Sequence, residues 1–345
     1  MSTPEYHQLT PATVKLSTHQ VAARARTFLS QPHLGQMAHL LGLDKNQLVL
    51  LSKSPRYDCF FIPKPKGGKR LIEAPREPLK GTQQRLAKWL QCVYFVHRSE
   101  AAFGFMMVPV DDEDPRHIYT HAQRHREATW LLNIDLKDFF HQIPADRVLR
   151  LFQQAPFGLT PKAAACLTGL CTFQGRLPMG APSSPVLSNF ACRDLDAELE
   201  ALARREGWVY TRYADDLTFS GPKPFTQAHW ESISGLIGAA GFKMNTKKMR
   251  LRHRKDKPEV TGLILKKNPD VSPDFLAGIE ADLLVLEALV SERMLLRDIF
   301  SRQPVKRLRR SIQGQINFLK AIRGKDHKSC RKLQNRLDQS VIKLK

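Results

Sequence analysis

Apolar residues in the first fifty positions recur at the spacing of a helix, as in Met37, Leu40 and Leu41. Residues three or four apart lie on one helix face, so we predict short helices in this segment. The pattern changes between Tyr57 and Ile72, where two short runs of aromatic and aliphatic residues flank a turn rich in Pro, Gly and Lys. This segment is predicted to be a β-hairpin with a basic turn.

Residues 82–97 return to helical spacing. Leu86, Leu90 and Val93 would form the buried face of this helix. The hydroxyl of Thr82 would cap its first turn. A separate acidic run follows at 111–114, and we interpret it as a loop whose charges face water.

Two stretches further along predict strands that end at acidic residues. The apolar run at 129–134 would deliver Asp135. In 208–219, two alternating runs meet at Asp215 and Asp216, so two strands are predicted. The tip carries two like charges in place of an ordinary Asn-Gly or Asp-Gly turn. The pair could be solvated at a surface turn, or a bound cation could offset its repulsion.

Helices are predicted at 161–172 and 187–204, with a structured loop of Gly, Pro and Ser at 175–185 between them. The VTGLIL run at 260–265 is predicted to be one strand. Strands and helices therefore follow one another in an irregular order, without a repeated βαβ unit. This order predicts the α+β fold class.

The composition indicates a folded protein that binds polyanions. The chain has 345 residues, 42% of them hydrophobic, and 54 Lys and Arg against 33 Asp and Glu, for a formal charge of +21. Nucleic acid is the expected partner, with an anionic membrane surface as the rival. No apolar run reaches the roughly 18 to 20 residues of a spanning helix, and no signal-peptide core is present, so we expect no membrane partner and a cytoplasmic location. The six cysteines lack zinc-site spacing and are interpreted as reduced thiols.

Asp135 and the pair Asp215 and Asp216 can converge if their strands are neighbours in one sheet. Phosphoryl transfer between nucleotides uses two divalent ions held by carboxylates, one at the attacking hydroxyl and one at the leaving pyrophosphate. Taken alone, Asp135 could instead cap the following helix. The combination favours a two-metal site.

Six segments in fixed order carry a specific resemblance. They span residues 57–265 and read IPKPKGGKRLIEAP, NIDLKDFF, LPMGAPSSPVLSNF, RYADDLTFSG, GFKMNTKKM and VTGLIL. The chain resembles a reverse transcriptase, and within that family it most resembles the bacterial retron type. The run GQINFLKAI at 314–322 is similar to the start of the family's thumb.

The resemblance implies a right-hand polymerase fold of the α+β class, with an antiparallel sheet in the palm. The implied parts are an N-terminal helical segment at 1–55, fingers at 56–130, a palm with interleaved fingers elements at 131–268, and a basic helical thumb at 269–345.

The resemblance also assigns the site. Two Mg²⁺ ions, for which Mn²⁺ could substitute, would be bound by Asp135, Asp215 and Asp216. The incoming deoxynucleoside triphosphate would be gripped by Lys64, Lys66 and Arg70. A solvated basic loop is the alternative for these last three residues.

Phe140 matches the aromatic residue that excludes a ribose 2′-hydroxyl, although Phe139 or Phe140 could instead belong to the core. Lys248 matches the lysine near the leaving pyrophosphate, where a cationic acid can donate a proton. A purely electrostatic role of Lys248 toward the template is the alternative. Met179 and Gly180 match the loop beside the nucleotide, and Met179 stands where the family usually has Gln.

Two elements point to the retron type. Val260, Thr261 and Gly262 match the VTG element that the family associates with recognition of its own RNA; an ordinary strand entering a turn is the alternative. An NAxxH-like element retains His125 but has His121 in place of Asn. For this histidine pair, RNA contact or packing is expected rather than a metal site.

Pro269 and Pro273 bracket a predicted linker to a helical C-terminal region. Its apolar positions are Leu308, Ile312, Ile316 and Leu319. Its basic positions are Lys306, Arg307, Arg309, Arg310, Lys320, Arg323, Lys325, Lys328, Arg331, Lys332 and Arg336. Such a basic face would contact the phosphates of a duplex or an RNA stem, and we expect RNA contacts from Arg307, Arg310, Lys320 and Arg323.

The resemblance implies an RNA-directed DNA polymerase that copies part of a cognate structured noncoding RNA. Priming from a 2′-hydroxyl of that RNA would leave a branched RNA–DNA product of the msDNA kind. The family acts in phage defence with an effector protein. The alternatives are another bacterial reverse transcriptase, of the group II intron or abortive-infection type, or a noncatalytic RNA-binding or effector-neutralising protein that keeps the fold.

Overall fold

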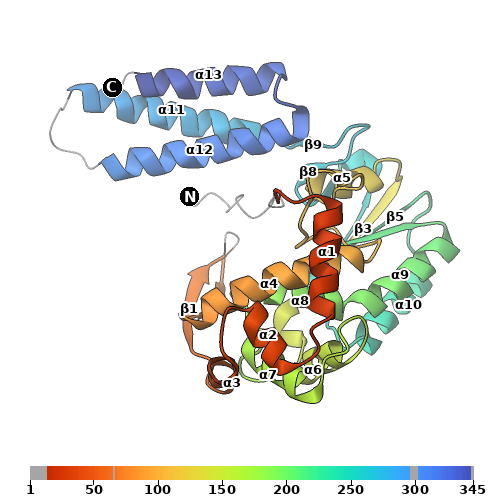
Figure 1. Ribbon diagram of the computed structural model, residues 1–345. Coiled ribbons are helices and arrows are strands. Elements are labelled where there is room, and N and C mark those ends of the chain that lie inside the picture. The colour runs from red at the N-terminus through yellow and green to blue at the C-terminus, as the bar shows by residue number, and fades with distance from the viewer. Residues whose placement is uncertain (1–13, 65–66, 296–301, 343–345) are drawn as a thin grey trace. The chain divides into compact units, whose positions relative to one another are not determined.

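The structure, a computed structural model, describes residues 14–64, 67–295 and 302–342 (Figure 1). These residues form two compact units. Of the described residues, the larger unit contains 14–117 together with 128–254. The smaller unit contains 118–127 and the residues from 255 onward.

The larger unit begins with the short helices predicted from the apolar spacing. They are α1 (Thr18–Leu29), α2 (Leu34–Leu40) and α3 (Lys45–Lys53). Ser17 and Asp44 cap α1 and α3, because each side chain accepts a hydrogen bond from the third helical N–H and the Gln at that position bonds back. The prediction of short N-terminal helices is confirmed.

The basic hairpin is also confirmed, with β1 (Tyr57–Pro63) and β2 (Lys69–Pro75) antiparallel. The next helix, α4 (Leu79–Val96), begins three residues before the predicted cap, so the capping role of Thr82 was wrong. The Thr82 hydroxyl donates instead to the carbonyl of Pro78, within the first turn. The predicted apolar face of α4 is fully buried.

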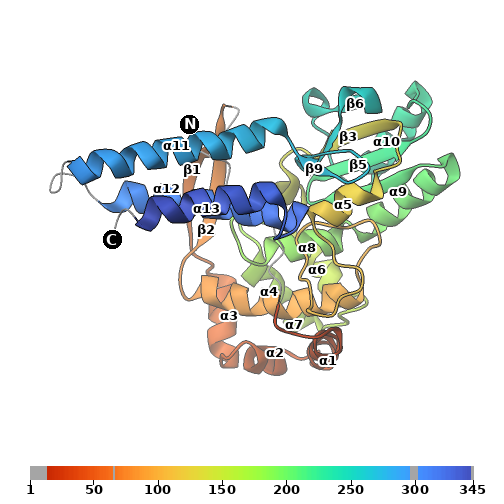
Figure 2. The same cartoon turned by 90° about the horizontal axis from the view of Figure 1, so that it is seen from above.

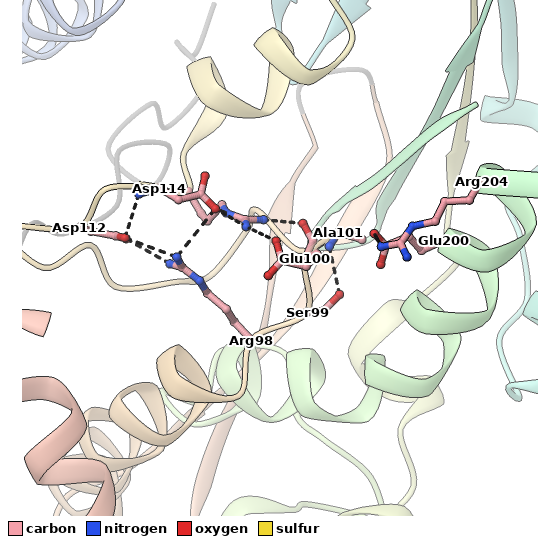
Figure 3. A network of polar contacts seen from close by, with 9 residues as sticks. Arg98, Ser99, Glu100, Ala101, Asp112, Asp114, Glu200 and Arg204 are labelled. Atoms are coloured by element: carbon pink, nitrogen blue, oxygen red, sulfur yellow. Dashed lines mark hydrogen bonds and ion pairs between the residues drawn. The ribbon is translucent and has the colours of Figure 1, made fainter. Parts of the chain in front are cut away.

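The acidic run at 111–114 is a loop, as predicted, but not all of its charges face water. The side chain of Asp112 is only 4% exposed, and its carboxylate lies 3.1 Å from the guanidinium of Arg98 (Figure 3). Asp114 pairs with Arg116, whose buried guanidinium also stacks on the ring of Phe103. Arg98 therefore neutralises the one buried carboxylate of the run, while Asp111 and Glu113 remain exposed.

The sheet of the larger unit has four antiparallel strands in the order β4-β5-β3-β6. The strands are β4 (Val209–Tyr213), β5 (Asp216–Gly221), β3 (Trp130–Asp135) and β6 (Arg250–His253). The predicted strand at 129–134 and the hairpin at 208–219 are therefore confirmed. Short 3-10 turns follow at Phe139–Gln142 (η2) and Thr246–Lys248 (η3).

The larger unit contains five further helices among its described residues, of which α9 packs against β4. They are α6 (Ala145–Gln153), α7 (Pro161–Cys171), α8 (Ser184–Ala191), α9 (Arg193–Glu206) and α10 (Gln227–Ala239). α9 and α10 lie side by side next to the sheet (Figure 2). The predicted helix at 187–204 is in fact α8 and α9, which meet at Cys192. No Gly or Pro marks this break in the sequence.

The smaller unit contains α5 (Ile118–Arg124) and a three-stranded antiparallel sheet of β7 (Glu259–Val260), β8 (Leu263–Ile264) and β9 (Asp270–Val271). The VTGLIL run is therefore a hairpin and not the single strand that we predicted. Its turn is formed by Thr261 and Gly262, both with positive φ. The predicted linker between the two prolines was also wrong, because it contains β9.

Three helices complete the smaller unit and lie side by side in both views (Figures 1 and 2). They are α11 (Pro273–Leu295), α12 (Arg302–Arg323) and α13 (Lys328–Ile342). The predicted apolar face of α12 is confirmed, since Ile312, Ile316 and Leu319 are fully buried. Among the described residues, no helix is long and apolar enough to span a membrane. The cysteines are free thiols, and Cys59 is the exposed one.

Candidate active site

The sheet brings the predicted acids together. Asp135 at the end of β3 is the direct register partner of Asp216 at the start of β5. Asp215 lies in the turn between β4 and β5, and its carbonyl accepts a hydrogen bond of 2.9 Å from the backbone N–H of Leu136. Two strands that are distant in sequence therefore place three carboxylates at one end of the sheet.

The turn that carries Asp215 is supported from below by a buried ion pair. Ala214, at the tip, has a φ of +57°. The guanidinium of Arg212 donates to the carbonyl of Ala214 at 3.1 Å and makes two bonds of 2.8 Å to Asp196 of α9. It also donates to Asn189 of α8 at 3.0 Å. Arg212 and Asp196 are both inaccessible to solvent, so the pair can hold the turn in one position.

Sequence reasoning missed this support. The available signal was a charged residue, Arg212, inside an otherwise apolar strand. A second missed feature is Gly104, since a Cβ there would lie 2.6 Å from the backbone nitrogen of Ala214. Only glycine allows this close approach to the turn that carries Asp215.

The carboxylates repel one another. The pKa of Asp215 is raised by burial and by the charge of Asp135. The pKa of Asp216 is raised to about 7 by partial burial and by the charges of Asp215 and Asp135. Asp216 keeps access to solvent, so repulsion from the neighbouring carboxylates acts on a group that water still reaches. The cluster therefore favours a nearby positive charge.

Lys248 supplies such a charge. Its Nζ lies 2.7 Å from Oδ1 of Asp135. The 3-10 turn η3 that carries Lys248 is fixed to β3, because the N–H of Asn245 donates to the carbonyl of Asp135 at 2.7 Å. The Lys248 side chain is 61% exposed, so it has room to move away from the acid.

The donor set suits a divalent cation. Carboxylate oxygens are the ligands that Mg²⁺ and Mn²⁺ prefer, and a divalent ion would relieve the repulsion among Asp135, Asp215 and Asp216. In the described part of the chain, however, no group of three or more His, Cys, Asp or Glu side chains is arranged to hold a metal ion as it stands. Lys248 already occupies one oxygen of Asp135. A metal ion that took this oxygen would compete with Lys248 for it.

The predicted phosphate-gripping residues lie on the basic hairpin. Arg70 is exposed on β2, opposite Ile62 of β1. Its charge opposes the rise in the pKa of Asp215, so its guanidinium lies within electrostatic reach of the acids. Lys64 is exposed at the turn, and its N–H donates to the carbonyl of Gly68 at 2.9 Å. Lys66 lies outside the described residues.

The two adjacent phenylalanines have different environments. Phe139 is buried and stacks on Phe242, with ring centroids 5.8 Å apart. Phe140 is half-buried, and its ring lies 5.8 Å from that of Phe105. Phe139 is therefore the core residue of the pair, and Phe140 is the one with a face left for a ligand.

The loop with Met179 and Gly180 lies on β2. The carbonyl of Met179 accepts a hydrogen bond of 2.7 Å from the N–H of Glu73. Gly180 has a φ of +127°, and a Cβ there would lie 2.9 Å from the carbonyl oxygen of Glu73. Glycine is therefore required at this contact.

These features match a known family. The profile of the reverse transcriptase (RNA-dependent DNA polymerase) family covers residues 62–265. The chain belongs to the reverse transcriptase family. It is therefore an RNA-directed DNA polymerase, a nucleotidyltransferase, and family membership implies dependence on a divalent metal. The α+β polymerase fold predicted from the sequence is confirmed.

Relatives of this reverse transcriptase are retron enzymes. Retron Ec86 reverse transcriptase of Escherichia coli is 29% identical over 254 residues, which cover 72% of this chain and 76% of that protein. Retron Mx162 reverse transcriptase of Myxococcus xanthus is 31% identical, covering 70% of this chain and 55% of its own length. Retron Mx65 reverse transcriptase of the same organism is 36% identical, and the match covers 60% of this chain and 50% of that protein. The retron type expected from the motifs is confirmed.

The two retron elements of this reverse transcriptase contact each other. His121 and His125 are buried on and beside α5, and Nδ1 of His121 lies 3.2 Å from Oγ1 of Thr261. Burial lowers the pKa of His125 to about 3 and that of His121 well below its usual value, so both rings are neutral. His125 and Val260, for which RNA contacts were expected, are buried, so neither side chain reaches solvent in this structure. Thr261 and Gly262 keep access to solvent.

The predicted RNA-binding residues of the C-terminal helices divide into two groups. Arg307 and Arg310 are exposed on α12. Lys320 donates to Gln334 of α13 at 2.6 Å. Arg323 makes two bonds, of 2.7 and 2.8 Å, to Asp270 of β9. Arg323 therefore has a structural partner, and the exposed arginines are the better placed to contact phosphates.

Proposed function

We propose that this reverse transcriptase copies part of a cognate structured noncoding RNA into a branched RNA–DNA product, in the manner of the retron enzymes. The proposal is supported by its similarity to three proteins named as retron reverse transcriptases. The VTG element and its contact with the NAxxH-like helix α5 support the same subtype. A role in phage defence with an effector protein completes the proposal.

The observation that carries the polymerase chemistry is the register pairing of Asp135 with Asp216, beside Asp215. These residues would hold two Mg²⁺ ions, which activate the attacking hydroxyl and stabilise the leaving pyrophosphate. The repulsion within the cluster favours such ions, since it is relieved only by positive charge.

The other residues act on the nucleotide. Lys64 and Arg70 present charges from the hairpin to the triphosphate, with Arg70 suited to a bidentate contact. Phe140 would lie under the sugar and exclude a 2′-hydroxyl. Lys248, once released from Asp135, would donate a proton or supply a charge at the pyrophosphate.

We assign the fingers to 56–130, the palm to 131–268 and the thumb to 269–345, with an N-terminal helical segment at 1–55. Within the thumb, Arg307 and Arg310 would contact RNA phosphates, while Thr261 and Gly262 offer the accessible part of the VTG element.

The test is to purify the protein with its bound nucleic acid, digest the RNA, and ask whether the DNA keeps a branched residual nucleotide. The Asp215→Asn variant, purified in parallel, should carry RNA without DNA. Unbranched DNA would favour another kind of bacterial reverse transcriptase. Absence of DNA and of magnesium-dependent nucleotide incorporation would favour a noncatalytic RNA-binding protein.

A further inference from the structure

We infer that Glu73 is a positioning residue that sets the shape of the nucleotide pocket and its selectivity for deoxyribose. The inference rests on the proposed function, since it assumes that Arg70 and Phe140 contact the nucleotide. Glu73 lies within the segment IPKPKGGKRLIEAP, but the sequence analysis gave it no role. Its importance comes from its carboxylate, which joins its own strand β2 to η2 and to the loop that carries Arg176 and Met179.

Each oxygen of Glu73 has a donor on another segment. Arg176 makes a two-pronged contact, with Nη1 2.9 Å from Oε2 and Nη2 3.0 Å from Oε1. Oε2 also lies 3.0 Å from Nε2 of His141 and accepts from the backbone N–H of Met179 at 3.2 Å. The Glu73 side chain is 1% exposed, so water does not compete for these contacts.

The carboxylate is ionised in this setting. Burial alone would raise the pKa of Glu73, but hydrogen bonds and charge from Arg176 lower the pKa below its usual value. A buried carboxylate is costly to maintain without such partners. A well-packed apolar residue at this position would stabilise the fold about as well. We therefore explain the Glu73 carboxylate by the segments that it holds in place.

Those positions belong to the nucleotide pocket. Arg70 lies three residues before Glu73 on the same strand, and Phe140 directly precedes His141. The Met179 loop is bonded to Glu73 through both its N–H and its carbonyl. Glu73 therefore connects the triphosphate contact, the sugar contact and the loop beside the nucleotide.

Met179 explains why the loop depends on Glu73 in this particular chain. Where the family usually has Gln, the thioether of Met179 offers only a weak hydrogen-bond acceptor. The loop is instead held by backbone hydrogen bonds to Glu73. Glu73 thereby supplies an anchor for the loop that does not depend on its side chain.

The Glu73→Gln variant tests the inference with a nearly isosteric change. Glutamine has one acceptor oxygen and an NH₂ donor, whereas Arg176 and the Met179 N–H both donate. At least one donor would then face another donor. We expect the KM for each deoxynucleotide to rise roughly tenfold, with kcat changed less than about threefold, because a charge-assisted hydrogen bond is lost. Incorporation of ribonucleotides relative to deoxynucleotides should rise.

The matched control is Glu200→Gln, which removes the charge from a surface ion pair with Arg204 on α9. It should leave KM and sugar selectivity at the wild-type values. A second variant, His141→Asn, breaks the Glu73 contact from a partly exposed residue and should alter sugar selectivity without a large change in melting temperature. The Arg176→Lys variant keeps a positive charge beside Glu73. Its sugar selectivity should therefore lie between those of the wild type and Glu73→Gln.

Failure of the proposed function and failure of the inference about Glu73 give different results. A wild-type enzyme that incorporates no nucleotide would overturn the proposed function itself. An active wild type, with folded Glu73→Gln and His141→Asn variants that keep wild-type KM and sugar selectivity, would overturn the role of Glu73. If Glu73→Gln does not fold, wild-type KM and sugar selectivity in a folded His141→Asn variant would be sufficient to overturn it.

Discussion

Nζ of Lys248 lies 2.7 Å from Oδ1 of Asp135, although 113 residues separate them in the chain. The ammonium group neutralises one member of a cluster of three acids. A divalent cation would compete with Lys248 for the same oxygen. A cation bound at the proposed metal site would therefore change the position of the Lys248 side chain.

Two substitutions of Lys248 distinguish its possible roles. Lys248→Met should slow nucleotide incorporation by roughly a hundredfold, whether the residue donates a proton or supplies charge. Lys248→Arg keeps the charge but is a poor proton donor, so it should restore the rate only if the role is electrostatic. Single-turnover incorporation would measure both, with the exposed Lys247→Met as the control. A wild-type rate in Lys248→Met would contradict either role.

Replacing either acid of the proposed metal site should remove activity. Asp135→Asn and Asp215→Asn are each expected to lower magnesium-dependent incorporation by at least about a hundredfold, because each removes a charge that a metal requires. Asp138→Asn is a fair control, since Asp138 is exposed and its φ of +44° is tolerated by asparagine. If either of the first two variants retained near wild-type incorporation, the metal site would have to lie elsewhere.

Phe139 and Phe140 should respond differently to truncation. Phe140→Ala should admit ribonucleotides with little loss of stability, because its ring is half-buried. Phe139→Ala should lower the free energy of unfolding by about 3 to 5 kcal/mol, because a buried ring is lost from the core. Primer extension with each sugar and thermal unfolding would separate these effects. Unchanged sugar selectivity in Phe140→Ala would refute its contact with the sugar.

Acid should destabilise the unit that contains α5. His121 and His125 are neutral when folded because burial lowers both pKa values, that of His125 to about 3. The unfolded chain binds these protons below its pKa of about 6.5, so stability falls as the pH decreases. We expect a loss of about 2 kcal/mol per histidine between pH 7.5 and 5.

Urea unfolding at the two pH values would measure this dependence. The variant with both His121→Asn and His125→Gln should show a flatter dependence, whereas exposed His39→Asn should behave as wild type. An equally steep dependence in the double variant would assign the acid sensitivity to other groups.

Arg307 and Arg310 should govern the salt dependence of RNA binding. Removing both with Gln should reduce the slope of log affinity against log salt by about 1 for each lost phosphate contact. Arg323→Gln should instead destabilise its unit by about 1 to 3 kcal/mol through loss of the Asp270 contact. Binding titrations at several salt concentrations would test this, and an unchanged slope in the double variant would exclude the α12 surface.

Much of the fold could be predicted from local patterns. The strand before Asp135, the hairpin around Asp215 and Asp216, and α7 follow from apolar spacing and turn residues, which act over a few positions. The break between α8 and α9 at Cys192 could not be predicted, because no helix breaker marks it. The burial of Asp112 was missed for a related reason, since its partner Arg98 lies in another segment.

The sequence by itself determined the chemistry available to this protein: three acids, a basic hairpin, a bulky aromatic and a strongly basic C-terminal region, in the order of a reverse transcriptase. Only the tertiary structure decided which of these groups meet. It paired Lys248 with Asp135, placed Arg212 under the turn that carries Asp215, buried His125, and gathered three donors on Glu73. These contacts join residues far apart in the chain, so no local pattern specifies them; packing and charge neutralisation in the folded state do.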